Sequence, residues 1–487
     1  MASGFGAAAT RTGSLRLCGL QVCFAGAIAM MLTACSHDAF EPTLTYAVPA
    51  RFDASKSTKP AKLAHWWTQF RSAELNHLIA TANFENLDIA VAVAQLDAAE
   101  AQAEIARAAL FPTINYQDNT SRSRSSGTGS SGRIGSASQR NSLSKQISAS
   151  YVVDVWGQNR DALEAALHSA GASAYQIEVV RIAAHAAVAN NFLIYAANRE
   201  RLSVATQNLA NAERVLAVLL ERRLAGTISD LEVVQQSSLV EIQRATLPLL
   251  RQAADQSRTA LALLIGRPVN QLKLGVRSIR RLRLPPVSPG VPATLLVRRP
   301  DVRNVEEQLA AADAHVDVAR KAFLPTITLS GFIGYQSATL VNLVRPESLV
   351  FNAAAGLAQP IFDGGRLRGQ LALSEAQRLQ LLESYRRSIL SAMTDVENAL
   401  IAIRDGAARE AAQQKAVEFA RQAFALSEDR LRQGTIDLQT LLTTQNTLFQ
   451  AEDTLIQVRL ARLQAIVTLY QALGGDWEEA GGLALSQ

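Results

Sequence analysis

The chain has 487 residues, of which 48 are basic, 43 are acidic and 6% are aromatic. At ~150 residues per domain this length allows about three domains or one very elongated one, and the apolar content excludes wholesale disorder. The basic residues are interspersed with acidic ones and are not clustered with aromatics, so we set nucleic-acid binding aside.

The first 34 residues are typical of an export signal. Arg11 and Arg16 precede an apolar stretch over 17–32, and no acidic residue occurs in this segment. It ends in Leu32-Thr33-Ala34-Cys35, which resembles a bacterial lipobox and predicts cleavage before Cys35 with lipid attached to its thiol. An ordinary signal peptide followed by a chance cysteine is the alternative.

Lipid attachment would make Cys35 the first residue of the mature chain. By resemblance to lipoproteins, Ser36 after the cysteine favours sorting to the outer membrane. Cys18 and Cys23 lie in the removed segment, so a disulfide framework is excluded. No run of about 18 uninterrupted apolar residues follows Cys35, so we expect no spanning helix, and a membrane role would require a barrel.

A helical pattern runs from Glu74 to Leu110 and ends at Phe111-Pro112. Two strands are predicted next, over 113–116 and 147–155, on either side of a Ser/Gly-rich segment at 119–138. That segment has three glycines in a GxGxxG spacing, namely Gly127, Gly129 and Gly132. No helix pattern follows them, so we interpret the segment as an exposed loop.

An internal repeat with a period near 210 residues organises the chain. Four landmarks recur in the same order: 111–114 as 324–327, 153–157 as 362–365, 223–228 as 431–436, and 264–266 as 472–474. We therefore expect an anchor and linker over 35–73, a first repeat over 74–268, an inter-repeat segment over 269–300, a second repeat over 301–475 and a tail over 476–487.

The predicted strands alternate apolar and polar residues, as in Ile147 to Val155 and Ile327 to Tyr335. This pattern suits a barrel wall with a wet lumen and suits a half-buried soluble sheet equally well. Two hairpins per chain are too few to close a barrel, so a barrel would require several chains.

Long helices follow each strand pair. The run from Asp161 to Arg223 would span roughly 90–95 Å at ~1.5 Å per residue, and heptad seams mark it as coiled coil. Pro248 is expected to kink or interrupt the helix that returns. Gly226 and Gly434 stand at the two helical reversals, where we expect backbone conformations with little room for a β-carbon.

A set of motifs gives the chain a family resemblance. It resembles the TolC-like outer-membrane efflux factors, in particular their lipidated NodT-type branch, over essentially the whole mature chain. The motifs are FPTI at 111–114, YVVDVWGQNR at 151–160, LLIGRP at 263–268, RRPDV at 298–302, FLPTITLSG at 323–331, QPIFDGGRL at 359–367 and LGGDW at 473–477.

The resemblance implies an α+β, mainly α, duplicated fold. Three chains would form one 12-stranded outer-membrane barrel with four strands from each, continued by a long periplasmic α-helical barrel and an equatorial belt. The implied function is the passive exit duct of a tripartite pump for small molecules such as drugs or toxic organics. The implied partners are two further copies of the chain, a periplasmic adaptor (membrane fusion) protein, an inner-membrane pump of the RND type and outer-membrane lipid. A type I protein secretion conduit and a coiled-coil scaffold without a pore are the alternatives.

The resemblance also assigns roles to residues. The adaptor-docking tips would include Arg222, Gly226, Thr227, Arg430, Gly434 and Thr435, and the strand–helix junctions would include Pro112, Trp156, Gly157, Pro325, Pro360 and Gly364. The family often closes the periplasmic aperture with an aspartate, but Thr443 stands at that place here. Asp437 is the substitute candidate, with Thr440 beside it, and a solvated tip aspartate is the alternative.

An enzyme is the rival class. The six histidines form no HExxH motif, and the chain has no GxSxG motif, no P-loop and no cysteine cluster for a metal. His65, beside Trp66 and Trp67, is interpreted as a packing residue. We expect no cofactor and no catalytic residue.

Overall fold

The computed structural model describes residues 47–54, 59, 63–124, 126, 139–286 and 289–477. The chain separates into two units, Met1–Thr45 and Tyr46–Gln487, and the described residues all belong to the second. Cys35, the predicted signal segment, the GxGxxG glycines and the end of the predicted tail lie outside the described residues.

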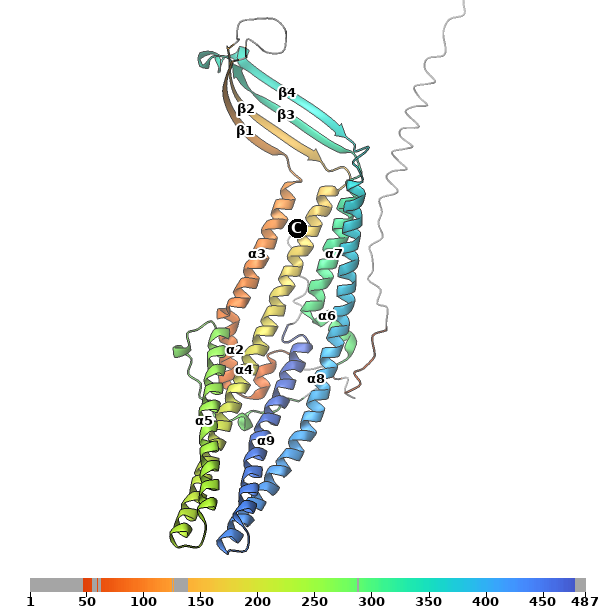
Figure 1. Cartoon of the computed structure of the whole chain (residues 1–487). Coiled ribbons are helices and arrows are strands. Elements are labelled where there is room, and N and C mark those ends of the chain that lie inside the picture. The colour runs from red at the N-terminus through yellow and green to blue at the C-terminus, as the bar shows by residue number, and fades with distance from the viewer. Residues whose placement is uncertain are drawn as a thin grey trace, which may run out of the picture. The chain divides into compact units, whose positions relative to one another are not determined.

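The first half of the described chain holds a short 3-10 helix, four α-helices and two strands, shown in Figure 1. These are η2 (Trp66–Phe70), α2 (Ala73–Glu85), α3 (Leu87–Ala108), β1 (Thr113–Arg124), β2 (Gln139–Val153), α4 (Gln158–Leu224) and α5 (Asp230–Leu264). The 3-10 turns η3 (Val269–Gln271), η4 (Ile279–Arg281) and η5 (Pro292–Thr294) lead to the second half.

The second half repeats this order. It comprises α6 (Leu295–Arg298), α7 (Pro300–Lys321), β3 (Thr326–Ser337), β4 (Leu349–Ala358), α8 (Arg366–Arg432) and α9 (Leu438–Ala472), with short turns η6 (Leu340–Asn342) and η7 (Pro346–Ser348) between the strands. Corresponding helices have equal lengths: 22 residues in α3 and α7, 67 in α4 and α8, and 35 in α5 and α9. The duplication found in the sequence is therefore also a duplication of structure.

The four strands form one antiparallel sheet in the order β1-β2-β3-β4. The register aligns Tyr116, Ile147, Ile333 and Phe351 across one face, and all four side chains are exposed. Because neighbouring residues point to opposite faces, Asn115, Ser148, Phe332 and Asn352 share the other face. One face of the sheet is thus an exposed apolar surface and the other is largely polar.

The strands are longer than predicted. β1 continues to Arg124, well into the segment predicted as a loop from 119 onward, and Asn119 pairs with Ser144. Side-chain contacts accompany the pairing: Lys145 pairs with Asp118 at 2.7 Å, and Ser144 Oγ donates to the Asn119 carbonyl at 3.4 Å. The prediction was wrong because these residues are polar on both faces and carry no apolar period-two signal.

The predicted helix from Glu74 to Leu110 is two helices. Asn86 breaks it with an extended backbone, and its Oδ1 caps α3 by accepting from the Ile89 backbone N–H at 3.0 Å. An asparagine followed by an acidic residue in the first turn, here Asp88, is a helix start signal that the periodicity concealed. Pro248 does not interrupt α5, which continues through it.

The helix α4 lies at the centre of the helical packing in the described region. It packs against α5, α3, α7 and α9, so both repeats contact it. Its length of 67 residues corresponds to ~100 Å at 1.5 Å per residue. Among the described helices, α4 alone is long and apolar enough to cross a membrane by composition, and these neighbours cover part of its apolar surface.

Candidate functional site

The two helical hairpins, α4–α5 and α8–α9, end in matching turns, which we call the first tip (222–228) and the second tip (430–436). In the first tip, Gly226 has φ +72° and donates its N–H to the Arg223 carbonyl at 2.9 Å, while the Thr227 N–H donates to the Arg222 carbonyl at 3.0 Å. This is the pattern of a helix C-terminus closed by a left-handed glycine.

The second tip repeats this geometry. Gly434 has φ +71°, and the Thr435 N–H and Oγ1 both donate to the Arg430 carbonyl, at 3.0 and 3.1 Å. The structure thus brings each predicted set of tip residues together. One expectation was wrong: a β-carbon at either glycine would meet nothing within 4 Å, so the positive φ selects glycine and crowding does not.

The residue after each tip caps the returning helix. Asp437 accepts from the Thr440 N–H at 2.9 Å and from Thr440 Oγ1 at 2.5 Å, and these hydrogen bonds hold the pKa of Asp437 below its ordinary value. In the first hairpin Ser229 and Glu232 form a capping box at the same place. Asp437 is therefore an exposed, ionised helix cap within each chain.

Thr440 and Thr443 lie on an exposed, uncharged face of α9. The Thr443 hydroxyl donates to the Gln439 carbonyl at 2.8 Å, and the hydroxyl of Thr447, one turn further, donates to the Thr443 carbonyl at 2.8 Å. Both hydroxyls therefore form hydrogen bonds within α9. No carboxylate stands on α9 between Asp437 and Glu452.

A contact between the two tips was not predicted. Arg222 Nη2 donates to the carbonyls of Leu431 and Arg432, both at 3.0 Å, so the arginine of one hairpin caps the end of α8 in the other. Arg214 pairs with Glu428 across the same contact. Arg222 and Arg430 occupy equivalent positions in the two repeats. Nothing in their local sequences indicates that it is Arg222, of the two, that bonds to the other hairpin.

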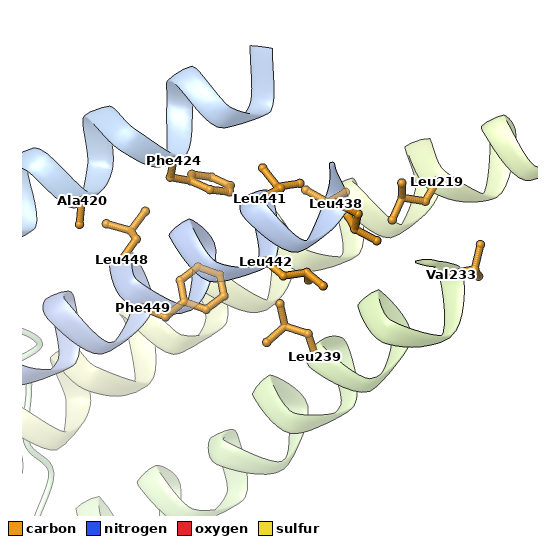
Figure 2. Packing of buried hydrophobic residues seen from close by; sticks show 11 residues of the cluster. Leu219, Val233, Leu239, Ala420, Phe424, Leu438, Leu441, Leu442, Leu448 and Phe449 are labelled. Carbon is orange, nitrogen blue, oxygen red and sulfur yellow. The ribbon is translucent and has the colours of Figure 1, made fainter. Parts of the chain in front are cut away.

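An apolar cluster joins the hairpins behind the tips (Figure 2). It includes Leu219 from α4, Leu239 from α5, Phe424 from α8, and Leu442 and Phe449 from α9. All are buried. The tips therefore pack on each other through a shared core, and they are not independent hairpins.

The outer surfaces of the two tips differ in chemistry. Leu224 of the first tip is 89% exposed. Arg432 stands at the corresponding place in the second tip and pairs with Glu428 at 3.2 Å. The first tip thus presents an apolar side chain where the second presents a paired cation.

The predicted junction residues connect the sheet to the helices. Trp156 Nε1 donates to the Pro325 carbonyl at 2.7 Å, which ties the two repeats together. Gly157, at φ +82°, directly precedes α4. The residue directly before α8 is Gly365, and the predicted Gly364 comes one position earlier. Gly364 and Gly365 both have positive φ. Pro112 and Pro360 lie exposed at the ends of β1 and β4.

Two aspartates in these junctions were part of the motifs but were not given a role. Asp154 accepts from the backbone N–H groups of Asn159 and Arg160, at 3.1 and 3.0 Å. Asp363 accepts from Gly365 and Leu367 N–H, at 3.0 and 2.9 Å. Each carboxylate satisfies donors at a helix start and holds the direction in which the long helix leaves the sheet.

Two buried glutamates hold the inter-repeat segment. Glu200 of α4 accepts from Ser278 Oγ at 2.7 Å and from the Ile279 N–H at 2.9 Å. Glu410 of α8 accepts from Arg459 and Arg462, each at 2.8 Å. Arg459 also donates to the Leu282 carbonyl at 3.2 Å, so the segment is fixed between both hairpins.

Two histidines, His65 and His185, lie against the aromatic ring of Trp67. His65 is exposed and its ring centroid lies 5.4 Å from that of Trp67. His185, which the sequence did not single out, is fully buried, with Nε2 2.6 Å from Asn83 Oδ1 and the ring 5.0 Å from Trp67. In the described residues no group of His, Cys, Asp and Glu side chains could hold a metal ion.

These features define a class of protein: a duplicated chain that joins a bilayer-compatible sheet to two helical hairpins whose longer helices, α4 and α8, each span ~100 Å. A family model described as "Outer membrane efflux protein" matches residues 78–267 and 291–475. The chain belongs to the outer membrane efflux protein family. Its predicted fold class and its predicted role as an outer-membrane efflux channel are confirmed.

Proteins similar to this chain are named as outer-membrane proteins of export and efflux, or as outer-membrane channels. The chain is 40% identical to the pyoverdine export outer membrane protein OpmQ of Pseudomonas putida, over 93% of this chain and 96% of that protein. It is 32% identical to the toluene efflux pump outer membrane protein TtgF, also of P. putida, over 88% of each. Among solved structures, the MtrE outer membrane channel of Neisseria gonorrhoeae in its open state has a TM-score of 0.80 at 25% identity, covering 90% of this chain and 98% of that one.

Proposed function

We propose that three copies of this chain form the exit duct of a tripartite efflux pump and passively conduct small molecules across the outer membrane. The observation that carries the proposal is the four-stranded sheet, with β1 and β4 as its edges and an exposed apolar face that includes Phe351. In lipid every backbone group must be paired, so an open sheet with two edges has to close with other copies. Three copies give a 12-stranded barrel, from four strands per chain.

The adaptor would dock on the two tips. They lie at the far ends of α4 and α8 from the sheet, ~100 Å along each helix. Their glycine-closed turns are exposed, and Leu224 offers apolar surface for a partner. An inner-membrane pump of the RND type would then deliver cargo into the helical tunnel, and Thr440, Thr443 and Asp437 would line its periplasmic aperture.

The cargo class follows from the relatives. Several are named as outer membrane proteins for export of pyoverdine or efflux of toluene. We propose small organic molecules as cargo and assign their selection to the pump, because a wide polar tunnel discriminates little between them. Cys35 would carry the lipid that anchors the mature N-terminus to the outer membrane.

Reconstitution in cells tests the proposal. A strain that lacks its own outer-membrane efflux channels receives this chain together with a candidate pump and adaptor, and accumulation of a fluorescent organic substrate is measured. Accumulation should fall only when all three components are present. Secretion of a protein substrate in place of the small molecule would assign the chain to type I secretion, and no effect with any RND-type partner would contradict the proposal.

A further inference from the structure

Two glutamines are buried among the residues of the apolar cluster that joins the hairpin tips. Gln236 lies seven residues after the cap Ser229 of α5, and Gln445 lies eight residues after the cap Asp437 of α9. Both glutamines are 0% exposed. Each is flanked on its own helix by residues of the apolar cluster, which are Val233 and Leu239 on α5, and Leu441, Leu442 and Leu448 on α9. The two repeats thus place a buried amide at nearly the same level.

Hydrogen bonds leave these amides incompletely satisfied. Gln236 Nε2 donates to the Ala212 carbonyl at 2.8 Å, but its Oε1 accepts nothing from the described residues. Neither Nε2 nor Oε1 of Gln445 has a partner there. Because Gln445 is enclosed within one chain, a neighbouring copy cannot reach its amide while the core is packed. A buried amide without partners weakens the packed state relative to one in which the amide meets water.

We propose that Gln445, assisted by Gln236, sets the balance between packed and separated hairpin tips. In Figure 2, Leu442 of α9 and Leu239 of α5 point toward each other across the contact between the hairpins. Gln445 lies three residues after Leu442 and four before Phe449, so helical spacing places it on the same face of α9, the face that must part from the first hairpin when the tips separate. Gln236 bonds to α4 within its own hairpin and has the supporting role. A wholly apolar core would hold the tips together, and two buried amides counteract that tendency. Single polar residues in coiled-coil cores likewise lower stability at a chosen layer.

The inference rests on the proposed function, because separation of the tips matters only if they form the periplasmic end of the duct. It identifies Gln445 as a positioning residue that acts through the packing of α9 and touches no cargo. Replacing its amide by an apolar group of similar volume should therefore favour the packed tips. Gln445→Leu is that change, and Gln445→Met replaces it if the leucine variant does not form trimers.

A matched control is available on the same helix. Gln450 lies five residues after Gln445 and is exposed, so Gln450→Leu makes the same chemical change outside the core. Gln236→Leu is the companion variant, with a smaller expected effect because the Nε2 of Gln236 already has a partner.

The test uses the full-length trimer in lipid nanodiscs. Amide hydrogen exchange is followed in segments 233–240 and 438–449, and the fraction of time in the open state is measured from single channels in planar bilayers. We expect Gln445→Leu to slow exchange in both segments by at least about 10-fold and to lower the open fraction to a similar extent, with Gln450→Leu unchanged.

The outcomes separate the inference from the proposed function. Exchange that is unchanged or faster in Gln445→Leu overturns the inference, and so does slower exchange with an unchanged open fraction. A wild-type trimer that never conducts contradicts the proposed duct, whereas the exchange comparison still decides whether Gln445 weakens the core. An equal effect of Gln450→Leu would also overturn the inference, since burial would then be irrelevant.

Discussion

Asn86 and Arg299 make the same contact in the two repeats with different chemistry. Asn86 Nδ2 donates to the Leu264 carbonyl at 2.7 Å, and Arg299 Nη1 donates to the Ala472 carbonyl at 3.2 Å. Each residue precedes the helix that leads into the sheet and binds the end of the helix that returns from the tip. The duplication is therefore preserved in this contact, although the two donors, Asn86 and Arg299, are different amino acids.

Asn86→Ala should lower stability more than an ordinary surface change. The substitution removes the cap of α3 and leaves the Leu264 carbonyl without its donor, for a combined loss of about 1–2 kcal/mol. Chemical denaturation of the purified trimer, followed by circular dichroism, measures it. Asn446→Ala, at an exposed position in α9, is the control and should have little effect. Equal stability of both variants would show that the cap is dispensable.

Substitutions of Gly434 should separate conformation from surface. Gly434→Ala should destabilise the second tip by about 1 kcal/mol because of its positive φ, and Gly434→Asn by less. Gly434→Trp adds a bulky group to the exposed turn, so we expect a heat-resistant trimer that no longer supports export, with Gly226→Trp similar or milder. Gly275→Trp in the inter-repeat segment should export normally. Full export by Gly434→Trp would show that this turn is not the docking surface.

Lipid attachment at Cys35 is tested by metabolic labelling. A radioactive fatty acid should label the wild-type chain and leave Cys35→Ser unlabelled. Assembly of the Cys35→Ser trimer should survive, because the sheet buries much more apolar surface in the bilayer than an acyl chain does. Label retained by the variant would contradict the assignment.

His168 should give the trimer a pH-dependent stability. Its Nδ1 lies 2.7 Å from Glu307 of α7, and this hydrogen bond, opposed by desolvation, raises the pKa of His168 above 6.5; Glu164 on α4 faces Nε2 at 4.0 Å. Because the pKa of His168 is raised in the folded state, the stabilisation from its contact with Glu307 is complete below about pH 6.5. This stabilisation is lost as the pH rises through the folded-state pKa of His168. Melting temperatures between about pH 5.5 and 8.5 should therefore fall less steeply in His168→Gln than in the wild type. His315→Gln, at an exposed position of α7, should keep the wild-type slope.

Features carried by local sequence were predictable. Gly226 and Gly434 have the positive φ that suits the helical reversals, and β1 and β3 begin at the threonines of the two Pro-Thr-Ile motifs, as expected. The duplication doubled every such signal, which is why the fold could be assigned from short motifs.

Features that depend on distant parts of the chain were missed. The bond from Arg222 to the end of α8, the glutamates Glu200 and Glu410 around the inter-repeat segment, and the extension of β1 all require knowledge of what lies opposite. Gln445 was missed for a related reason: it follows the heptad seam by one position, and its burial depends on packing between helices that are distant in the sequence.

Single-channel conductance tests the central claim most directly. Purified full-length trimer is added to a planar lipid bilayer, and current is recorded without pump or adaptor. An exit duct predicts discrete, uniform conductance steps that scale with trimer concentration. A heat-resistant trimer that inserts into the bilayer and yet never conducts would contradict the account.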